Sequence, residues 1–138
     1  MSSFPDSLLI RAAAIRLVLT DVDGVLTDGR LWYGPSGEEL KAFDARDGMA
    51  IGMLRDCGID VGLISGRTSR PLIARADDLA IAIRHLGVDD KSGALDAILA
   101  EGDYRLDEVA YLGDDLPDLP VLERVGLAAV PSDAIEQA

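Results

Sequence analysis

The chain has 138 residues, of which 49% are hydrophobic, and a formal net charge of −12. This size suits one domain whose core needs no disulfide, and the sequence holds a single cysteine. The negative charge argues against nucleic acid or an anionic membrane as a partner, because phosphate-rich surfaces favour basic proteins. No apolar run reaches the roughly 18 residues of a membrane span, so we expect a cytoplasmic protein.

Short β-favouring runs alternate with segments of helical periodicity along the chain. The β-favouring runs cover residues 16–20, 60–64, 80–84, 108–112 and 126–130. The helical patterns cover residues 48–57, 69–78, 92–100 and 116–124. The alternation predicts an α/β fold over residues 1–138, a Rossmann-like three-layer α/β/α domain with a central parallel sheet and right-handed crossovers.

Residues 26–43 interrupt this alternation between the first strand and the first helix. They contain "GRLWYGPSGEELKAF", with two extended runs around residues 34–37. This pattern predicts a β-hairpin that projects from the carboxyl end of the first strand, and we call residues 26–43 the flap. We expect Trp32 and Tyr33 to pack at its base or against a neighbouring subunit.

Polar residues collect at the carboxyl ends of three predicted strands, the edge where open parallel sheets bind ligands. They are Asp21 and Asp23 after the first strand, Ser65, Gly66 and Arg67 after the second, and Asp114, Asp115 and Asp118 after the fourth, with Lys91 opening the third helix. Two acidic clusters suit Mg²⁺, which takes carboxylate oxygens, water and phosphate oxygens. Serine, glycine amides at a helix N-terminus and a lysine suit a phosphate group.

The spacing of Asp21 and Asp23 adds to this hypothesis. Residues two apart in an extended chain point the same way, so both carboxylates would address one substrate. One can attack while the other handles the leaving-group proton. Each motif alone also has a structural explanation, as a turn or as the N-cap of a helix. Their ordered occurrence at successive strand ends favours a catalytic site, whereas Asp28 lacks such support and is interpreted as a turn residue.

Four stretches resemble the signature motifs of haloacid dehalogenase-like (HAD) phosphatases: "DVDGVLTDG", "ISGR", Lys91 and "GDDLPDLPVL". The longer stretch "DVDGVLTDGRLWYGPSGEELKAFDARDGMAI" resembles the capless branch that includes 3-deoxy-D-manno-octulosonate 8-phosphate phosphatases. The resemblance implies the strand order 3-2-1-4-5. It also implies a Mg²⁺-dependent phosphomonoesterase that hydrolyses a phosphorylated 2-keto-3-deoxy sugar acid, in the context of lipopolysaccharide synthesis.

The resemblance also implies a role for each motif residue. Asp21 would be the nucleophile that forms an aspartyl-phosphate, and Asp23 would be the general acid and base. Ser65 and Lys91 would bind phosphate and stabilise the intermediate. The Mg²⁺ ligands would be Asp21, the Asp23 backbone carbonyl and Asp114, with Asp115 and Asp118 around them. The substrate would contact Asp23, Asp44, Ala45, Arg46, Asp47, Gly48, Gly66, Arg67, Arg75 and Lys91.

The spacing agrees with an enzyme that has no cap domain. About 25 residues separate Ser65 from Lys91, which is enough for one helix and one strand. Family members assemble so that one subunit covers another's site, and by resemblance we expect a homotetramer. Two features depart from the family: Gly52 stands where an arginine is usual, and the chain stops at "VPSDAIEQA" where relatives continue with a glycine-rich tail.

Three other functions remain open at this point. The substrate could be a nonulosonate 9-phosphate or another sugar phosphate. The chain could be an idle regulatory or assembly domain, like those fused to acylneuraminate cytidylyltransferases. A signalling receiver domain would also be an α/β domain phosphorylated on aspartate, but receivers place an adjacent acidic pair after the first strand, and here that pair comes late.

Overall fold

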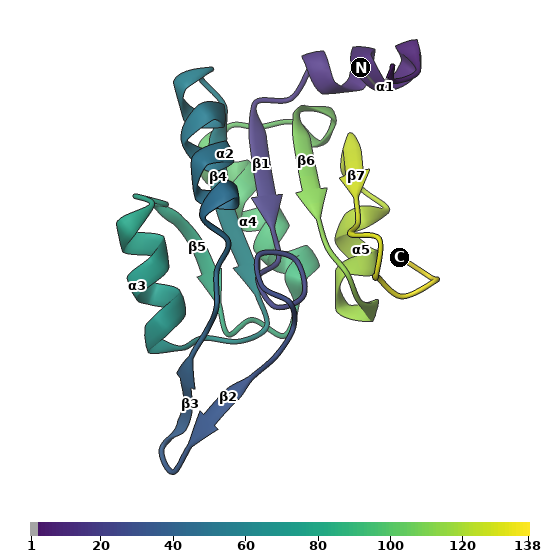
Figure 1. Ribbon diagram of the computed structural model, residues 1–138. Coiled ribbons are helices and arrows are strands. Elements are labelled where there is room, and N and C mark those ends of the chain that lie inside the picture. The colour runs from purple at the N-terminus through teal and green to yellow at the C-terminus, as the bar shows by residue number, and fades with distance from the viewer. Residues whose placement is uncertain (1–2) are drawn as a thin grey trace.

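A computed structural model describes residues 3–138. Its middle layer is a five-stranded parallel sheet in the order β5-β4-β1-β6-β7 (Figure 1). The strands are β1 (Leu17–Thr20), β4 (Asp60–Ser65), β5 (Ile83–Leu86), β6 (Val109–Leu112) and β7 (Leu127–Ala129). The predicted order 3-2-1-4-5 is therefore confirmed, with β1 at the centre of the sheet.

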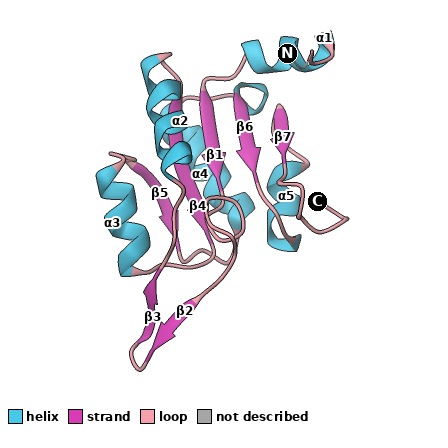
Figure 2. Ribbon diagram, in the orientation of Figure 1, coloured by secondary structure: helices cyan, strands magenta, loops and turns pink. Residues whose placement is uncertain are grey.

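Helices cover both faces of the sheet, so the predicted three layers are also confirmed (Figure 2). On one face, α2 (Ala45–Asp56) and α3 (Arg70–Asp78) pack against Val61 and Leu63 of β4. On the other face, α4 (Lys91–Gly102) and α5 (Leu119–Leu122) pack against Leu17 and Leu19 of β1. Successive side chains of a strand point to opposite faces, which is why buried strands supply both cores.

The flap forms the expected hairpin. Strands β2 (Trp32–Gly34) and β3 (Gly37–Leu40) pair antiparallel and project beyond the carboxyl ends of β1 and β4 (Figure 1). Trp32 and Tyr33 are 52% and 63% exposed, so neither packs into the core of this chain. The Tyr33 hydroxyl accepts a hydrogen bond from the Arg67 guanidinium at 3.1 Å, which joins the flap to the loop after β4.

Some predicted boundaries were wrong. The strand expected at residues 80–84 begins at Ile83, because α3 ends at Asp78 and Ala80 turns the chain with a φ of 53°. The helix expected at residues 116–124 is divided into a 3-10 turn, η2 (Leu116–Asp118), and the short α5. Pro117 and Pro120 lack backbone N–H groups and interrupt a continuous helix there.

Two short elements were not predicted, namely α1 (Asp6–Ala13) and the 3-10 turn η1 (Leu106–Glu108). Helix α1 has no buried residue, and Leu9 and Ile10 are exposed. Within residues 3–138, every helix is too short or too polar to cross a lipid bilayer.

Candidate active site

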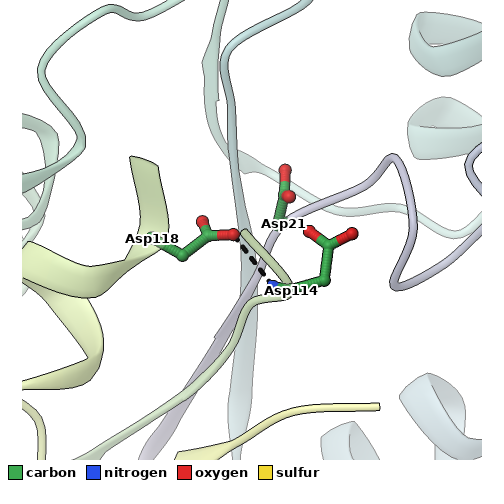
Figure 3. A group of neighbouring side chains, drawn as sticks. All are labelled: Asp21, Asp114 and Asp118. Carbon is green, nitrogen blue, oxygen red and sulfur yellow. Dashed lines mark hydrogen bonds between the residues drawn. The ribbon is translucent and has the colours of Figure 1, made fainter. Parts of the chain in front are cut away.

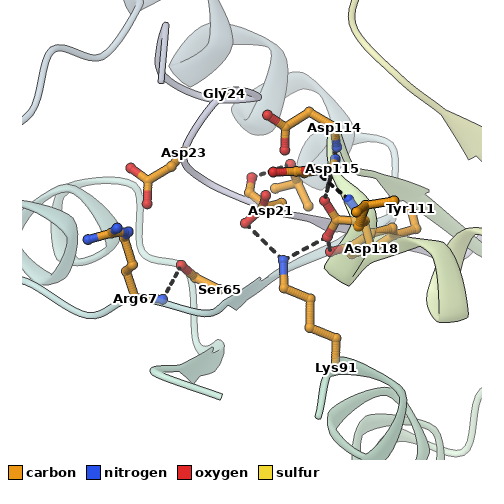
Figure 4. Close-up of polar contacts among 12 residues, drawn as sticks. Asp21, Asp23, Gly24, Ser65, Arg67, Lys91, Tyr111, Asp114, Asp115 and Asp118 are labelled. Carbon is orange, nitrogen blue, oxygen red and sulfur yellow. Dashed lines mark hydrogen bonds and ion pairs between the residues drawn. The ribbon is translucent and has the colours of Figure 1, made fainter. Parts of the chain in front are cut away.

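The structure brings the predicted motif residues to one small hollow at the carboxyl edge of the sheet (Figure 4). The hollow measures about 170 Å³, below the roughly 300 Å³ at which pockets begin to enclose a small ligand. It therefore suits a phosphate group and leaves a larger substrate partly outside. Its lining is Asp21, Asp23, Ser65, Gly66, Arg67, Lys91, Asp114, Asp115, Pro117 and Asp118.

Asp118 is the buried residue that holds the acidic side of the hollow together. It is fully buried, and its Oδ1 accepts hydrogen bonds from Lys91 Nζ at 2.7 Å and from the Tyr111 hydroxyl at 2.5 Å. Its Oδ2 accepts from the backbone N–H groups of Asp114 at 2.9 Å and Asp115 at 3.2 Å. Burial alone would raise the pKa of Asp118, but these bonds outweigh it and hold the pKa below its ordinary value.

Lys91 is the first residue of α4 and its side chain is 5% exposed. The helix begins there because the Asp90 carboxylate caps it, accepting from the backbone N–H of Gly93 at 3.0 Å. Lys91 Nζ lies 2.7 Å from Asp118 Oδ1 and 3.2 Å from Asp21 Oδ1. One ammonium group therefore faces two buried carboxylates.

Asp21 follows β1 directly and is 7% exposed. Burial raises its pKa from 3.8 to about 7, although the nearby Lys91 acts in the opposite direction. Carboxylate oxygens of Asp21, Asp114 and Asp118 lie within 4.8 Å of one another (Figure 3). One lysine does not neutralise three carboxylates, so this group has an excess of negative charge.

The donor set fits Mg²⁺. Asp118 uses both oxygens on four donors of the protein, which makes it a support for the site. Asp21 and Asp114 retain carboxylate oxygens for a cation, and Mg²⁺ typically takes one or two carboxylates together with water and phosphate oxygens.

Gly24 is a site residue that the sequence analysis missed. Its φ is +87°, and a Cβ at this position would lie 1.8 Å from Asp114 Oδ2. The glycine therefore allows the loop after β1 to approach the Asp114 carboxylate closely. The sequence did offer a signal for Gly24, which is its position directly after Asp-x-Asp. Glycine there permits a positive φ that other residues disfavour.

The argument that placed Asp21 and Asp23 on one side of an extended strand was wrong. Strand β1 ends at Thr20, and the Val22 carbonyl accepts from the N–H of Leu26 at 2.9 Å, so the chain turns. Both carboxylates still line the hollow, but they meet different cations. Asp21 faces Lys91, whereas Asp23 faces Lys41 of the flap.

The loop after β4 forms the opposite wall of the hollow. Ser65 is 1% exposed, and its Oγ accepts from the backbone N–H of Arg67 at 3.2 Å. The N-terminus of α3 is already capped by Ser69, which accepts from the N–H of Leu72 at 3.3 Å. We therefore expect phosphate contacts from Ser65 at the end of β4 and from Gly66 and Arg67 after it, and not from the capped N-terminus of α3.

Of the residues predicted to contact the substrate, Asp23, Gly66, Arg67 and Lys91 line this hollow and the other six do not. Asp44, Ala45, Arg46, Asp47, Gly48 and Arg75 gather at the start of α2 and are absent from the lining of the hollow. Asp44 caps α2, accepting from the N–H of Arg46 at 2.8 Å. With Asp47 it lines a separate hollow of about 410 Å³ at the base of the flap. In a single chain, Asp44 and Asp47 thus line the hollow at the flap base and not the one that holds Asp21.

Tyr111 and Lys41 were also missed as neighbours of the site. Tyr111 is a polar-tipped residue in an otherwise apolar strand, and Lys41 is one of only two lysines in the sequence. Both features are visible in the sequence. The contacts of Tyr111 and Lys41, however, are with residues across a turn or far away in the chain.

We expect Gly24→Ala to weaken Mg²⁺ binding, because the new Cβ would displace the Asp114 carboxylate. Gly37→Ala is the matched control, since Gly37 has a φ of +107° but no atom within 4 Å of its Cβ position. Both variants carry backbone strain of about 1 kcal/mol or more. Thermal unfolding with and without Mg²⁺ measures the effect, and equal Mg²⁺-induced shifts in the two variants would contradict it.

We expect Asp21→Asn to change the pH dependence of stability when divalent metal is removed. The pKa of Asp21 is raised on folding, so its contribution to stability is present below pH 4 and is lost as the pH rises through about 7. The variant lacks this loss. Its unfolding free energy relative to wild type should therefore rise from pH 4 to pH 8, by on the order of 1–3 kcal/mol. Urea unfolding in EDTA measures the difference, and a pH-independent difference would refute the expectation.

Comparison with known proteins places this geometry in a family. No family model matches the chain. The 3-deoxy-D-manno-octulosonate 8-phosphate phosphatase of Yersinia pestis is 46% identical over 129 residues, which cover 94% of this chain and 69% of the relative. The crystal structure of the Yersinia pestis phosphatase matches with a TM-score of 0.92 and 45% identity, covering 95% of this chain and 71% of that chain.

A second solved structure resembles the chain equally in fold. It is the 3-deoxy-D-manno-octulosonate 8-phosphate phosphatase of Moraxella catarrhalis in complex with a magnesium ion, a phosphate ion and a KDO molecule. It has a TM-score of 0.92 and 36% identity, and the match covers 97% of this chain and 77% of that chain. The chain belongs to the 3-deoxy-D-manno-octulosonate 8-phosphate phosphatase family of the HAD superfamily.

Proposed function

We propose that this chain is a Mg²⁺-dependent phosphomonoesterase that hydrolyses 3-deoxy-D-manno-octulosonate 8-phosphate to 3-deoxy-D-manno-octulosonate and phosphate. The observation that carries this proposal is the buried Asp21 carboxylate, placed beside Lys91 in a hollow that also holds Ser65 and Asp114. Relatives of 41–46% identity carry this phosphatase name, which supports the substrate. We further infer that residues 1–138 act as one catalytic domain, and that it works in the cytoplasm.

In the proposed reaction, an Asp21 oxygen attacks phosphorus and the bond to the sugar oxygen breaks. Asp23 gives its proton to the leaving sugar oxygen, and the phosphoryl group remains on Asp21. Asp23 then takes a proton from a water molecule, whose oxygen attacks phosphorus and releases inorganic phosphate. Asp21 is thereby regenerated as a carboxylate, and Asp23 carries a proton again.

The other residues of the hollow would stabilise charge during both steps. Lys91 Nζ, 3.2 Å from Asp21, lies where negative charge shifts between the carboxylate and the phosphoryl group. Ser65 and the amides beside it would hold phosphate oxygens. A bound Mg²⁺ supplies positive charge that reduces repulsion between Asp21 and a phosphate dianion, and Asp21, the Asp23 carbonyl and Asp114 would hold it. Asp118 would keep Lys91 and the Asp114 loop in place.

We also propose that the chain forms a homotetramer. Its support is the set of exposed apolar side chains on the flap and on α2, which are Trp32, Tyr33, Leu40, Met49 and Met53. Packing of this surface against other copies would cover the open hollow. It would also let the patch from Asp44 to Gly48, with Arg75, serve a site on a neighbouring copy.

The catalytic proposal is tested by phosphate release from a panel of sugar phosphates in the presence of Mg²⁺. We expect the octulosonate 8-phosphate to be hydrolysed fastest, EDTA to abolish turnover reversibly, and Asp21→Asn to lower kcat by about 10³-fold or more. Asp28→Asn is the control, because Asp28 is an exposed turn residue that accepts from the N–H of Arg30 at 3.0 Å.

Negligible rates across the whole panel would favour the idle-domain alternative. Faster hydrolysis of a nonulosonate 9-phosphate would retain the chemistry and change the substrate.

Light scattering tests the assembly. We expect wild type to have four times the mass of the chain, and Trp32→Glu on the flap to dissociate it because a charge would be buried at the contact. Ile10→Glu, at an even more exposed apolar position on α1, should leave the mass unchanged. A monomeric wild type would overturn the tetramer without bearing on the chemistry.

A further inference from the structure

The flap inserts a buried lysine beside the candidate site. Lys41 directly follows β3, and its side chain is 0% exposed. Its Nζ contacts Asp23 Oδ1 and lies 2.6 Å from Glu38 Oε1. An ammonium group in such a place is costly unless it is paired, and here two carboxylates pair with it.

The two carboxylates of Asp-x-Asp are thus held by different parts of the fold. Asp21 is paired with Lys91 of α4, and Asp23 is paired with Lys41 of the flap. Asp23 lies in the turn after β1, outside the regular alternation that fixes the directions of side chains in a strand. Among the hydrogen bonds of residues 3–138, the one from Lys41 is the single bond made by the Asp23 carboxylate.

Glu38 keeps the ammonium group in position. Its side chain is only 9% exposed and forms an ion pair with Lys41, three residues further along the flap. Burial alone would lower the pKa of Lys41, but the hydrogen bond to Asp23 and the ion pair with Glu38 outweigh it, so the pKa lies above its ordinary value and the group stays charged. A side chain this enclosed is poorly placed to contact substrate, which leaves an indirect role.

We propose that Lys41 is a positioning residue that holds the Asp23 carboxylate at the phosphate hollow and so makes the acid/base step depend on the flap. The inference rests on the proposed function, because it gives Lys41 a task only if Asp23 moves the proton. Lys41 acts through the direction of the Asp23 carboxylate, and it neither binds the phosphate nor holds the metal.

This role has a kinetic signature that a general loss of structure lacks. Removing the Lys41 contact should lower kcat and leave KM nearly unchanged, since the phosphate contacts of Ser65 and Lys91 stay in place. The loss should also depend on Asp23. Two residues that act as one unit give non-additive losses, so removing Lys41 should cost little once Asp23 is gone.

The test is a double-mutant cycle on kcat, with Lys41→Met, Asp23→Asn and the double variant. We expect Lys41→Met to lower kcat for the octulosonate 8-phosphate by about 10-fold or more, a part of what general acid/base catalysis contributes. The double variant should be no slower than Asp23→Asn alone. Lys41→Arg should recover part of the rate because it restores a cation, and Glu38→Gln should give a smaller loss.

A substrate with an activated leaving group gives a second readout. p-Nitrophenolate departs without protonation, so Lys41→Met should keep the initial burst of p-nitrophenol from p-nitrophenyl phosphate while later turnover slows. Arg30→Met is the control, because Arg30 is a flap cation whose side chain is 77% exposed and whose partner is Asp28. It should match wild type in both assays.

The outcomes separate the two proposals. Multiplicative losses in the cycle, or a rise in KM with kcat unchanged, would overturn the role of Lys41 while wild-type turnover upholds the phosphatase. A wild type that releases no phosphate from any substrate would overturn the proposed function and the inference with it. If Lys41→Met does not fold, Lys41→Arg and Glu38→Gln carry the test, and wild-type kcat in both would refute the inference.

Discussion

The candidate site depends on the buried ion pair between Lys91 and Asp118. Two charges removed from water are costly, and the cost is met only when the remaining lone pairs find donors. Here the Tyr111 hydroxyl and two backbone N–H groups complete the shell of Asp118. The pair therefore joins α4 to the loop after β6, and it sets the position of Asp114 through the backbone and of Asp21 through the shared ammonium group.

The site carries an excess of negative charge, which the rest of the fold must tolerate. Asp21, Asp114 and Asp118 lie close together with one buried lysine among them, and burial raises the pKa of Asp21. The two apolar cores on either side of the sheet hold the strand ends together despite this repulsion. A divalent cation relieves the repulsion, so the arrangement that disfavours the metal-free site favours metal binding.

The flap relates the surface of the molecule to its chemistry. It carries exposed aromatic side chains on β2 and a buried lysine after β3, and it reaches the site at Asp23 and at Arg67. The element that carries the exposed aromatic side chains is therefore also the one that holds Asp23 through Lys41.

The sequence by itself determined the layers, the parallel sheet and the strand ends at which polar residues collect, because side-chain periodicity is a local consequence of burial. It placed Asp21, Ser65, Lys91, Asp114 and Asp118 at one edge for the same reason. Only the tertiary structure decided the direction of Asp23, the approach of Gly24 to Asp114 and the contact between Lys41 and Asp23, and it moved the patch at Asp44 away from the hollow. These contacts depend on how a turn, a flap and a helix pack against residues distant in sequence, and no local pattern records that packing.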